Sequence, residues 1–307
     1  MRDFSYTAGP QDEGRKVYHV LRRELALSAS LVKRLKNAGA IYLNGAPAFT
    51  DVRLKAGDTV SARPDLAERP ADLEPEEGAV EVLYETEAYA VVNKPAGVIV
   101  HPSMARLRGS LAALVSGYFL RTGGSAVCHV VNRLDRDTSG CVIFAKGAHY
   151  KTLLSQALAE DAGKEYLAVN YGLLPSESGI IDEPIRRAEP MKMRRIVSPD
   201  GRRAVTEYQR VRQAEAMGES VSLNRFVLRT GRTHQIRVHS AFLGSPVLGD
   251  CIYGTEASDA LSARLGLTSQ LLHARRISFR DPFTGKDVSV EAPINREDFF
   301  IIPNLLN

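Results

Sequence analysis

Residues 132–140, with the sequence NRLDRDTSG, form the densest group of polar side chains in the chain. Two carboxylates, Asp135 and Asp137, stand among two arginines, and apolar runs flank the segment. A carboxylate held beside arginines can serve as a nucleophile or a general base. The same pattern is typical of a turn between two strands, in which Asp, Thr and Ser side chains bond the local backbone and ion pairs are structural. The residues alone leave both interpretations open.

A second polar cluster, RTGRTHQIRVH, occupies residues 229–239. If its last part is a strand, alternation places Gln235, Arg237 and His239 on one face of that strand. His234 then lies on the other face, so the two histidines point apart, and no third metal ligand is nearby in the sequence. We therefore expect no metal site here.

A third segment, from Arg186 to Arg203, contains seven Lys/Arg residues and two Asp/Glu residues. Its prolines, Gly201 and scarcity of large apolar side chains predict an exposed basic arm. Clustered cations are what phosphate binding requires, although a solvated loop has the same composition. The composition of this segment alone leaves both interpretations open.

The composition is that of a globular protein, with 307 residues, 44% hydrophobic and 25% charged, and 40 Lys+Arg against 36 Asp+Glu. This length predicts about two domains with cores that need no disulfide or metal. The three cysteines form no C-x-x-C pair, which predicts neither a disulfide framework nor a cysteine zinc site. No stretch resembles a membrane span, a signal peptide or a nucleotide-binding glycine loop, so we expect a cytoplasmic protein without a nucleotide cofactor.

Charge is unevenly distributed along the chain. Residues 11–63 carry ten Lys/Arg against five Asp/Glu, whereas residues 64–78 carry six acids, one base and three prolines. Prolines and repelling like charges favour an extended, exposed segment. We therefore expect a basic domain over 11–63, a linker over 64–79 and a second domain over 80–300.

Apolar periodicity predicts the elements within these domains. In the basic domain, two short helices are expected; the second begins after Ser28 or Ser30 and ends at Gly39, and Asn44-Gly45 predicts a hairpin after it. From residue 80 onward, short apolar segments separated by turn residues predict many strands, and the best helical patterns cover 110–119 and 150–158. Because no βαβ repeat is visible, the second domain is predicted to be α+β and largely antiparallel, behind a small α/β module. The expected strands are 80–83, 88–92, 98–100, 141–145, 166–169, 226–228 and 236–238.

The basic domain resembles a known RNA-binding module. The run RKVYHVLRRELALSASLVKRLKNAGAIYLNG, followed by AGDTV, is similar to the S-four-type module over residues 15–62. On charge pattern alone, the basic residues of its second helix would be a solvated face. The resemblance implies instead that this face contacts RNA through Lys33, Arg34 and Lys36.

The second domain resembles the RluA family of pseudouridine synthases, which convert uridine to pseudouridine in structured RNA. NRLDRDTSG is similar to the signature of that family. Further family stretches follow in the expected order: NKPAGVIVHPS at 93–103, KEYLAVNYG at 164–172, LRTGRTHQIRVH at 228–239 and LLHA at 271–274.

The resemblance assigns roles to individual residues. Asp135 matches the catalytic aspartate of the family, Tyr166 the tyrosine near the target base, and Arg237 the arginine that pairs with the aspartate. Arg133 matches a residue that helps to displace the target nucleotide, and Leu272 is implied to line the same pocket. A charged partner such as Arg237 would keep a buried aspartate ionised.

One residue departs from the family pattern, because Asn132 stands where the family usually has histidine. Asparagine can donate and accept hydrogen bonds but cannot become cationic, so its contact with RNA is expected to differ. The family reaction needs neither metal nor cofactor. The implied partner is RNA, ribosomal RNA of the large subunit before transfer RNA, bound by a monomer. A synthase-like binding protein without turnover and a base-releasing glycosylase remain alternatives.

Overall fold

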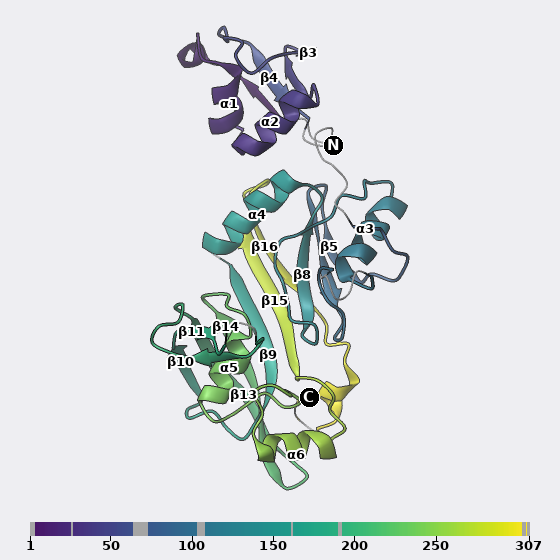
Figure 1. Cartoon of the computed structure of the whole chain (residues 1–307), viewed down its shortest axis with the longest axis vertical. Helices are drawn as coiled ribbons and strands as arrows, with labels where there is room; N and C mark the ends of the chain where they lie inside the picture. The colour runs from purple at the N-terminus through teal and green to yellow at the C-terminus, as the bar shows by residue number, and fades with distance from the viewer. Residues whose placement is uncertain are drawn as a thin grey trace.

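The computed structural model describes residues 4–25, 27–63, 73–102, 108–160, 162–189, 192–302 and 305. Figure 1 shows the short N-terminal elements at one end of the molecule and the long strands of a large sheet in the rest. In the parts of the chain that the structure describes, no helix is both long and apolar enough to cross a membrane.

The N-terminal elements enclose a core of their own. Two helices cover a four-stranded sheet of order β1-β4-β2-β3, and the buried side chains of this core all lie between Ala8 and Ala62. The predicted helices and hairpin are confirmed. Ser28 caps the second helix by accepting from the N–H of Leu31 at 3.2 Å, and Asn44 and Gly45 turn the hairpin with positive φ. The elements are β1 (Phe4–Thr7), η1 (Pro10–Asp12), α1 (Val17–Arg23), α2 (Ala29–Asn37), β2 (Ile41–Leu43), β3 (Ala46–Pro47) and β4 (Thr59–Ala62).

The rest of the chain is built on a ten-stranded sheet whose main path runs β10-β13-β14-β9-β15-β8-β6-β5. Strand β16 pairs with β15, and β7 pairs with β8. All neighbours are antiparallel except β8 and β15, so the fold is α+β as predicted. The strands are β5 (Val82–Glu85), β6 (Tyr89–Lys94), β7 (His129–Val130), β8 (Ser139–Ala145), β9 (Gly163–Tyr171), β10 (Ser178–Asp182), β13 (Val205–Ala216), β14 (Glu219–Leu228), β15 (Leu272–Arg280) and β16 (Asp287–Glu291).

Helices on the two faces of the sheet explain why its central strands are almost wholly apolar. Along β6, Tyr89 and Val91 face the core that contains Leu154 of α4 (Ala148–Glu160), whereas Ala90 and Val92 face the core of α3 (Leu111–Arg121). A strand covered on both faces buries every side chain, so it shows no polar alternation. The remaining helices are α5 (Gln235–Phe242), α6 (Glu256–Arg264) and η3 (Glu297–Phe300).

The acidic linker lies partly outside the described residues, which resume at Leu73. From there to Ala79 the chain has no regular secondary structure and is mostly exposed. The N–H of Glu76 donates to the carbonyl oxygen of Ala113, and Arg121 donates to that of Gly78, so this stretch lies against α3. The boundaries expected for the two domains remain predictions.

Three expectations about local structure need correction. The segment 236–238 is not a strand but the first full turn of α5. The segment 98–100 forms only an isolated bridge, between Ile99 and Ser110. The basic segment from Arg186 to Arg203 is not a plain arm, because its described residues form a two-stranded hairpin of β11 (Ile185–Arg187) and β12 (Arg195–Val197).

Candidate active site

Asp135 lies in a tight turn that enters β8. The N–H of Thr138 donates to the carbonyl oxygen of Asp135 at 3.2 Å, which closes the turn. Two residues further on, Gly140 has a φ of 111°, and a Cβ there would overlap the carbonyl oxygen of Ala274 on β15. Only glycine allows β8 and β15 to approach so closely at the point where both reach the site.

Arg237 on α5 contacts two carboxylates at once. Its Nη1 donates to Oδ2 of Asp135 at 3.0 Å, while its Nε and Nη2 donate to the two oxygens of Asp250 at 2.6 and 2.8 Å. The side chain of Arg237 is 5% exposed and that of Asp250 is wholly buried, whereas that of Asp135 is 27% exposed. Burial opposes the charge on the arginine, but the hydrogen bonds and charges of Asp250 and Asp135 outweigh it and raise the pKa of Arg237. The predicted pairing of Arg237 with Asp135 is present.

His234 also faces the carboxylate, with Nε2 3.7 Å from Oδ2 of Asp135. It caps the start of α5 in the left-handed conformation, with a φ of 60°, and its Nδ1 lies 2.8 Å from the hydroxyl of Tyr253. Burial lowers the pKa of His234 despite the nearby charge of Asp135, so the imidazole is neutral at pH 7. The strand interpretation separated His234 from Arg237, whereas residues three apart on a helix share a face.

A cavity of about 70 Å³ opens beside the two charged groups. Its apolar side chains are Tyr166, Leu228 and Leu272 from three different strands, Ile236 from α5, and Leu134 from the turn before β8. Burial and the charge of Asp135 raise the pKa of Tyr166, and its hydroxyl hydrogen-bonds to no residue that the structure describes. The structure therefore unites Asp135, Tyr166, Arg237 and Leu272 around one opening.

Two predicted RNA-contacting residues near the turn differ in their surroundings. Arg133 is exposed and lines the cavity, without a partner among the described residues. Asn132 instead bonds the backbone of β8, since its Oδ1 accepts from Ile143 N–H at 2.8 Å and its Nδ2 donates to the Cys141 carbonyl oxygen at 3.3 Å. Its amide continues the strand pairing and does not line the cavity.

The predicted basic face of α2 is also present. Lys33, Arg34 and Lys36 are exposed, while Leu31, Val32 and Leu35 turn into the N-terminal core. None of the three basic residues lines the cavity around Asp135. The charged face is therefore a separate surface.

Two residues at the site were missed by the sequence interpretation, Asp250 and Tyr253. Both belong to the segment LGDCIYG, in which the carboxylate of Asp250 accepts from the N–H groups of Ile252 and Tyr253. An acidic residue between apolar runs was a possible signal, but nothing in its spacing pointed to Arg237. The described residues contain no group of three or more His, Cys, Asp or Glu that could hold a metal ion.

Comparison with known proteins identifies the family. Residues 88–242 match the RNA pseudouridylate synthase family. The chain is 35% identical over 285 residues to the uncharacterized RNA pseudouridine synthase YhcT of Bacillus subtilis, covering 92% of this chain and 91% of that protein. It is 36% identical over 278 residues to ribosomal large subunit pseudouridine synthase D of Xanthomonas campestris, covering 87% and 81% of the two chains.

A solved structure supports the same assignment. Human RNA pseudouridylate synthase domain containing 1 superposes with a TM-score of 0.58 and 25% identity, covering 71% of this chain and 86% of that one. The family match and these relatives show that the chain belongs to the RNA pseudouridylate synthase family and is an RNA pseudouridine synthase, an isomerase, in which a buried arginine binds a partly exposed aspartate.

Proposed function

We propose that this synthase isomerises uridine in large-subunit ribosomal RNA and that Asp135 carries the reaction. The observation that supports the role of Asp135 most directly is its position. It is the partly exposed carboxylate of the Asp135–Arg237–Asp250 group, and it lines the cavity together with Tyr166 and Leu272. A carboxylate with access to substrate on one side and a fixed cationic partner on the other suits glycosyl chemistry.

The reaction breaks the bond from ribose to a ring nitrogen, turns the uracil, and joins the ribose to carbon 5 of the same base. Asp135 can open this sequence either by attacking the anomeric carbon or by removing a proton from the neighbouring ribose carbon. In both routes Arg237 holds the carboxylate in place through the 3.0 Å hydrogen bond. At the end carbon 5 gives up its proton to water and the ring nitrogen that carried the ribose takes up a proton, so the product is an isomer of uridine and no electrons are exchanged with another reactant.

The cavity walls suit the intermediate stage, when the base is detached. Tyr166 offers a ring face for stacking, and Leu134 and Leu272 exclude water that would otherwise trap the sugar as a hydrolysed product. Removing a base from its stack costs a few kcal/mol. The exposed Arg133 at the rim is placed to fill the vacated space and offset part of that cost.

Two features favour ribosomal RNA as the substrate. The relative from Xanthomonas campestris is named a ribosomal large subunit synthase, and residues 15–62 resemble the S-four-type module. We propose that the basic face of α2 binds phosphates of the same RNA, which positions the enzyme without reading sequence. Changing Lys33, Arg34 and Lys36 together to Gln should then weaken RNA binding and leave the single-turnover rate at saturating RNA unchanged.

The test is tritium release from RNA labelled at uracil carbon 5, with separate ribosomal and transfer RNA transcripts. Wild-type protein should release tritium from ribosomal RNA, and Asp135→Asn should release none while it still binds. Asp137→Asn is the matched control, because this neighbouring carboxylate pairs with exposed Arg136 and does not line the cavity. Loss of release in both variants would contradict the assignment to Asp135.

Other outcomes separate the remaining alternatives. Release from transfer RNA alone would replace the proposed substrate. Free uracil among the products would indicate a glycosylase, since an isomerase returns the base to the same ribose. Tight RNA binding without release from either transcript would indicate a binding protein that lacks turnover.

A further inference from the structure

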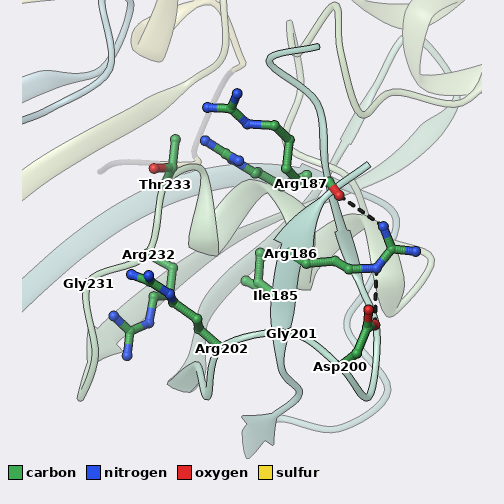
Figure 2. A pocket seen from close by; sticks show the side chains of 10 residues that line it. Ile185, Arg186, Arg187, Asp200, Gly201, Arg202, Gly231, Arg232 and Thr233 are labelled. Carbon is green, nitrogen blue, oxygen red and sulfur yellow. Dashed lines mark hydrogen bonds and ion pairs between the residues drawn. The ribbon is translucent and has the colours of Figure 1, made fainter. Parts of the chain in front are cut away.

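A second, larger cavity of about 430 Å³ lies next to the catalytic one. It opens between the β11–β12 hairpin and the loop Gly231–Thr233, which leads from β14 into α5. Five arginines and a single acidic residue, Asp200, line this arginine cavity (Figure 2). The arginines are Arg186, Arg187, Arg195, Arg202 and Arg232.

The single carboxylate of the cavity neutralises only part of this positive charge. Asp200 pairs with Arg186 at 3.1 Å, and Figure 2 shows these two side chains turned toward each other. Among the residues that the structure describes, Arg195 and Arg202 form no ion pair. The Nε of Arg195 is moreover buried without a hydrogen-bond partner. The guanidinium groups of Arg195 and Arg202 therefore lack a counter-charge that an anionic ligand could supply.

The hairpin places like charges against each other. Arg187 and Arg195 are directly opposite across the β11–β12 pair, and Arg202 bridges to Ile185 on the same hairpin. Like charges directly opposite on neighbouring strands destabilise their pairing. An anion seated beside Arg195 and Arg202 would supply the counter-charge that these two side chains lack, and arginine suits phosphate because its planar fork matches two oxygens at once.

We propose that the arginine cavity binds backbone phosphate of the RNA strand next to the target uridine. Arg232 lines both the arginine cavity and the catalytic cavity, so the two are neighbours along one path over the surface. A nucleotide whose base enters the catalytic cavity therefore has its flanking phosphates within reach of the arginines. This inference rests on the proposed function, and it adds a binding site for the RNA backbone close to the reacting base.

The experiment removes charge from the cavity without touching catalytic residues. Arg195→Gln, Arg202→Gln and the double variant are compared with wild type, and Arg280→Gln is the charge-matched control because it is exposed at the far end of β15. The probe is a transcript of bacterial large-subunit ribosomal RNA, with Kd measured across a series of salt concentrations. Each lost phosphate contact should weaken binding about five- to eightfold at 0.1 M salt and reduce the slope of log Kd against log salt by about 0.7–0.9.

The tritium-release rate at saturating RNA should stay at the wild-type value in all variants. If Arg195→Gln and Arg202→Gln bind RNA as Arg280→Gln does, with the same salt slope, the cavity does not hold RNA phosphate. That result would leave the proposed function intact, because tritium release is read separately. If wild type binds RNA but releases no tritium, the proposed function fails while the Kd series still decides the role of the cavity.

A further arm distinguishes RNA phosphate from a free phosphate ion. Inorganic phosphate is added to wild type and to the double variant, and the thermal midpoint is measured. A rise in midpoint for wild type alone, together with unchanged RNA binding in the variants, would overturn the proposal in favour of a site for the free anion. The proposal is supported if the variants bind RNA more weakly than wild type and if added inorganic phosphate also weakens RNA binding by wild type, because phosphate would compete with the RNA for the same arginines.

Discussion

Replacing Asp250 by Asn should show how much the buried partner of Arg237 contributes. Oδ1 of Asp250 accepts from Arg237 Nη2 and from the N–H groups of Ile252 and Tyr253, whereas Oδ2 accepts from Arg237 Nε at 2.6 Å. The amide oxygen of Asn will take the Oδ1 position, where it meets three donors. Its NH2 group then faces Arg237 Nε, so two donors oppose each other in a buried site.

The expected cost follows from these contacts. A hydrogen bond between charged groups contributes about 1.5–3 kcal/mol, and a buried donor left unsatisfied costs about 1–3 kcal/mol. Their sum agrees with the cost of breaking a buried ion pair, about 3–5 kcal/mol. Since typical domains unfold with about 5–15 kcal/mol, Asp250→Asn should remove a large part of the folding free energy.

The assay is urea unfolding at pH 7, with Glu207→Gln as the matched control. Glu207 also makes a bidentate pair with an arginine, Arg229, at 2.8 and 3.1 Å, but its side chain is 34% exposed and that of Arg229 is 60% exposed. An exposed pair of this kind contributes less than about 1 kcal/mol. Equal losses of stability in Asp250→Asn and Glu207→Gln would refute the reasoning from burial.

The same variant should affect catalysis through Arg237. Without its second partner the guanidinium can shift away from Asp135, and a displacement of about 1 Å at a reacting group can cost about 10²-fold in rate. The single-turnover rate of Asp250→Asn should therefore fall while the Kd for RNA stays unchanged. An unchanged rate in folded Asp250→Asn would show that Asp135 alone is enough to hold Arg237 in position.

Three other perturbations test the framework around the site. Burial lowers the pKa of His273 from 6.5 to about 4, so as pH falls the unfolded chain binds this proton before the folded chain does. The free energy of unfolding should therefore drop by about 3 kcal/mol as the pH falls from 6.5 to 4. Urea unfolding of His273→Gln should show a weaker dependence on pH over this range. Gly140→Ala introduces a Cβ against the carbonyl oxygen of Ala274 at a φ of 111° and should cost at least about 2 kcal/mol in thermal unfolding, more than the same change at the open position Gly39. Ser28→Ala removes the cap of α2 and should cost about 1 kcal/mol, and unchanged stability would exclude that capping role.

The sequence predicts correctly those elements that depend on interactions between residues close together in the chain. The cap at Ser28 and the hairpin at Asn44-Gly45 depend on contacts within a few residues, and both occur as expected. The prediction of a strand over 236–238 was wrong because Ile236, Arg237 and Val238 alternate in polarity, as the residues of a half-buried strand do. Every residue of α5 from Gln235 to Ser240 is buried, so this part of the helix does not have one polar and one apolar face. Hydrophobic periodicity therefore could not identify the segment as a helix.

The parts of the site differ in the same way. Asp135, Arg237, Tyr166 and Leu272 were placed together by family resemblance, because each lies in a stretch with a recognisable order of residues. Asp250 was not, since its role depends on a contact with Arg237 that the tertiary fold creates. The arginine cavity was visible only as excess charge between Arg186 and Arg203, and Arg232 joins it from a separate segment.

The arrangement around Arg237 suggests why one arginine serves two carboxylates. If Asp135 reacts as proposed, a buried guanidinium with Asp135 as its single partner would lose its counter-charge whenever Asp135 formed a bond or took up a proton. Asp250 supplies a permanent, buried counter-charge through two hydrogen bonds, so that loss never leaves Arg237 unpaired. Asp135 makes one hydrogen bond to the arginine, is 27% exposed and lines the cavity. Under the proposed mechanism, Asp135 can therefore change its bonding during the reaction while the buried pair of Arg237 and Asp250 keeps α5 and the cavity wall fixed.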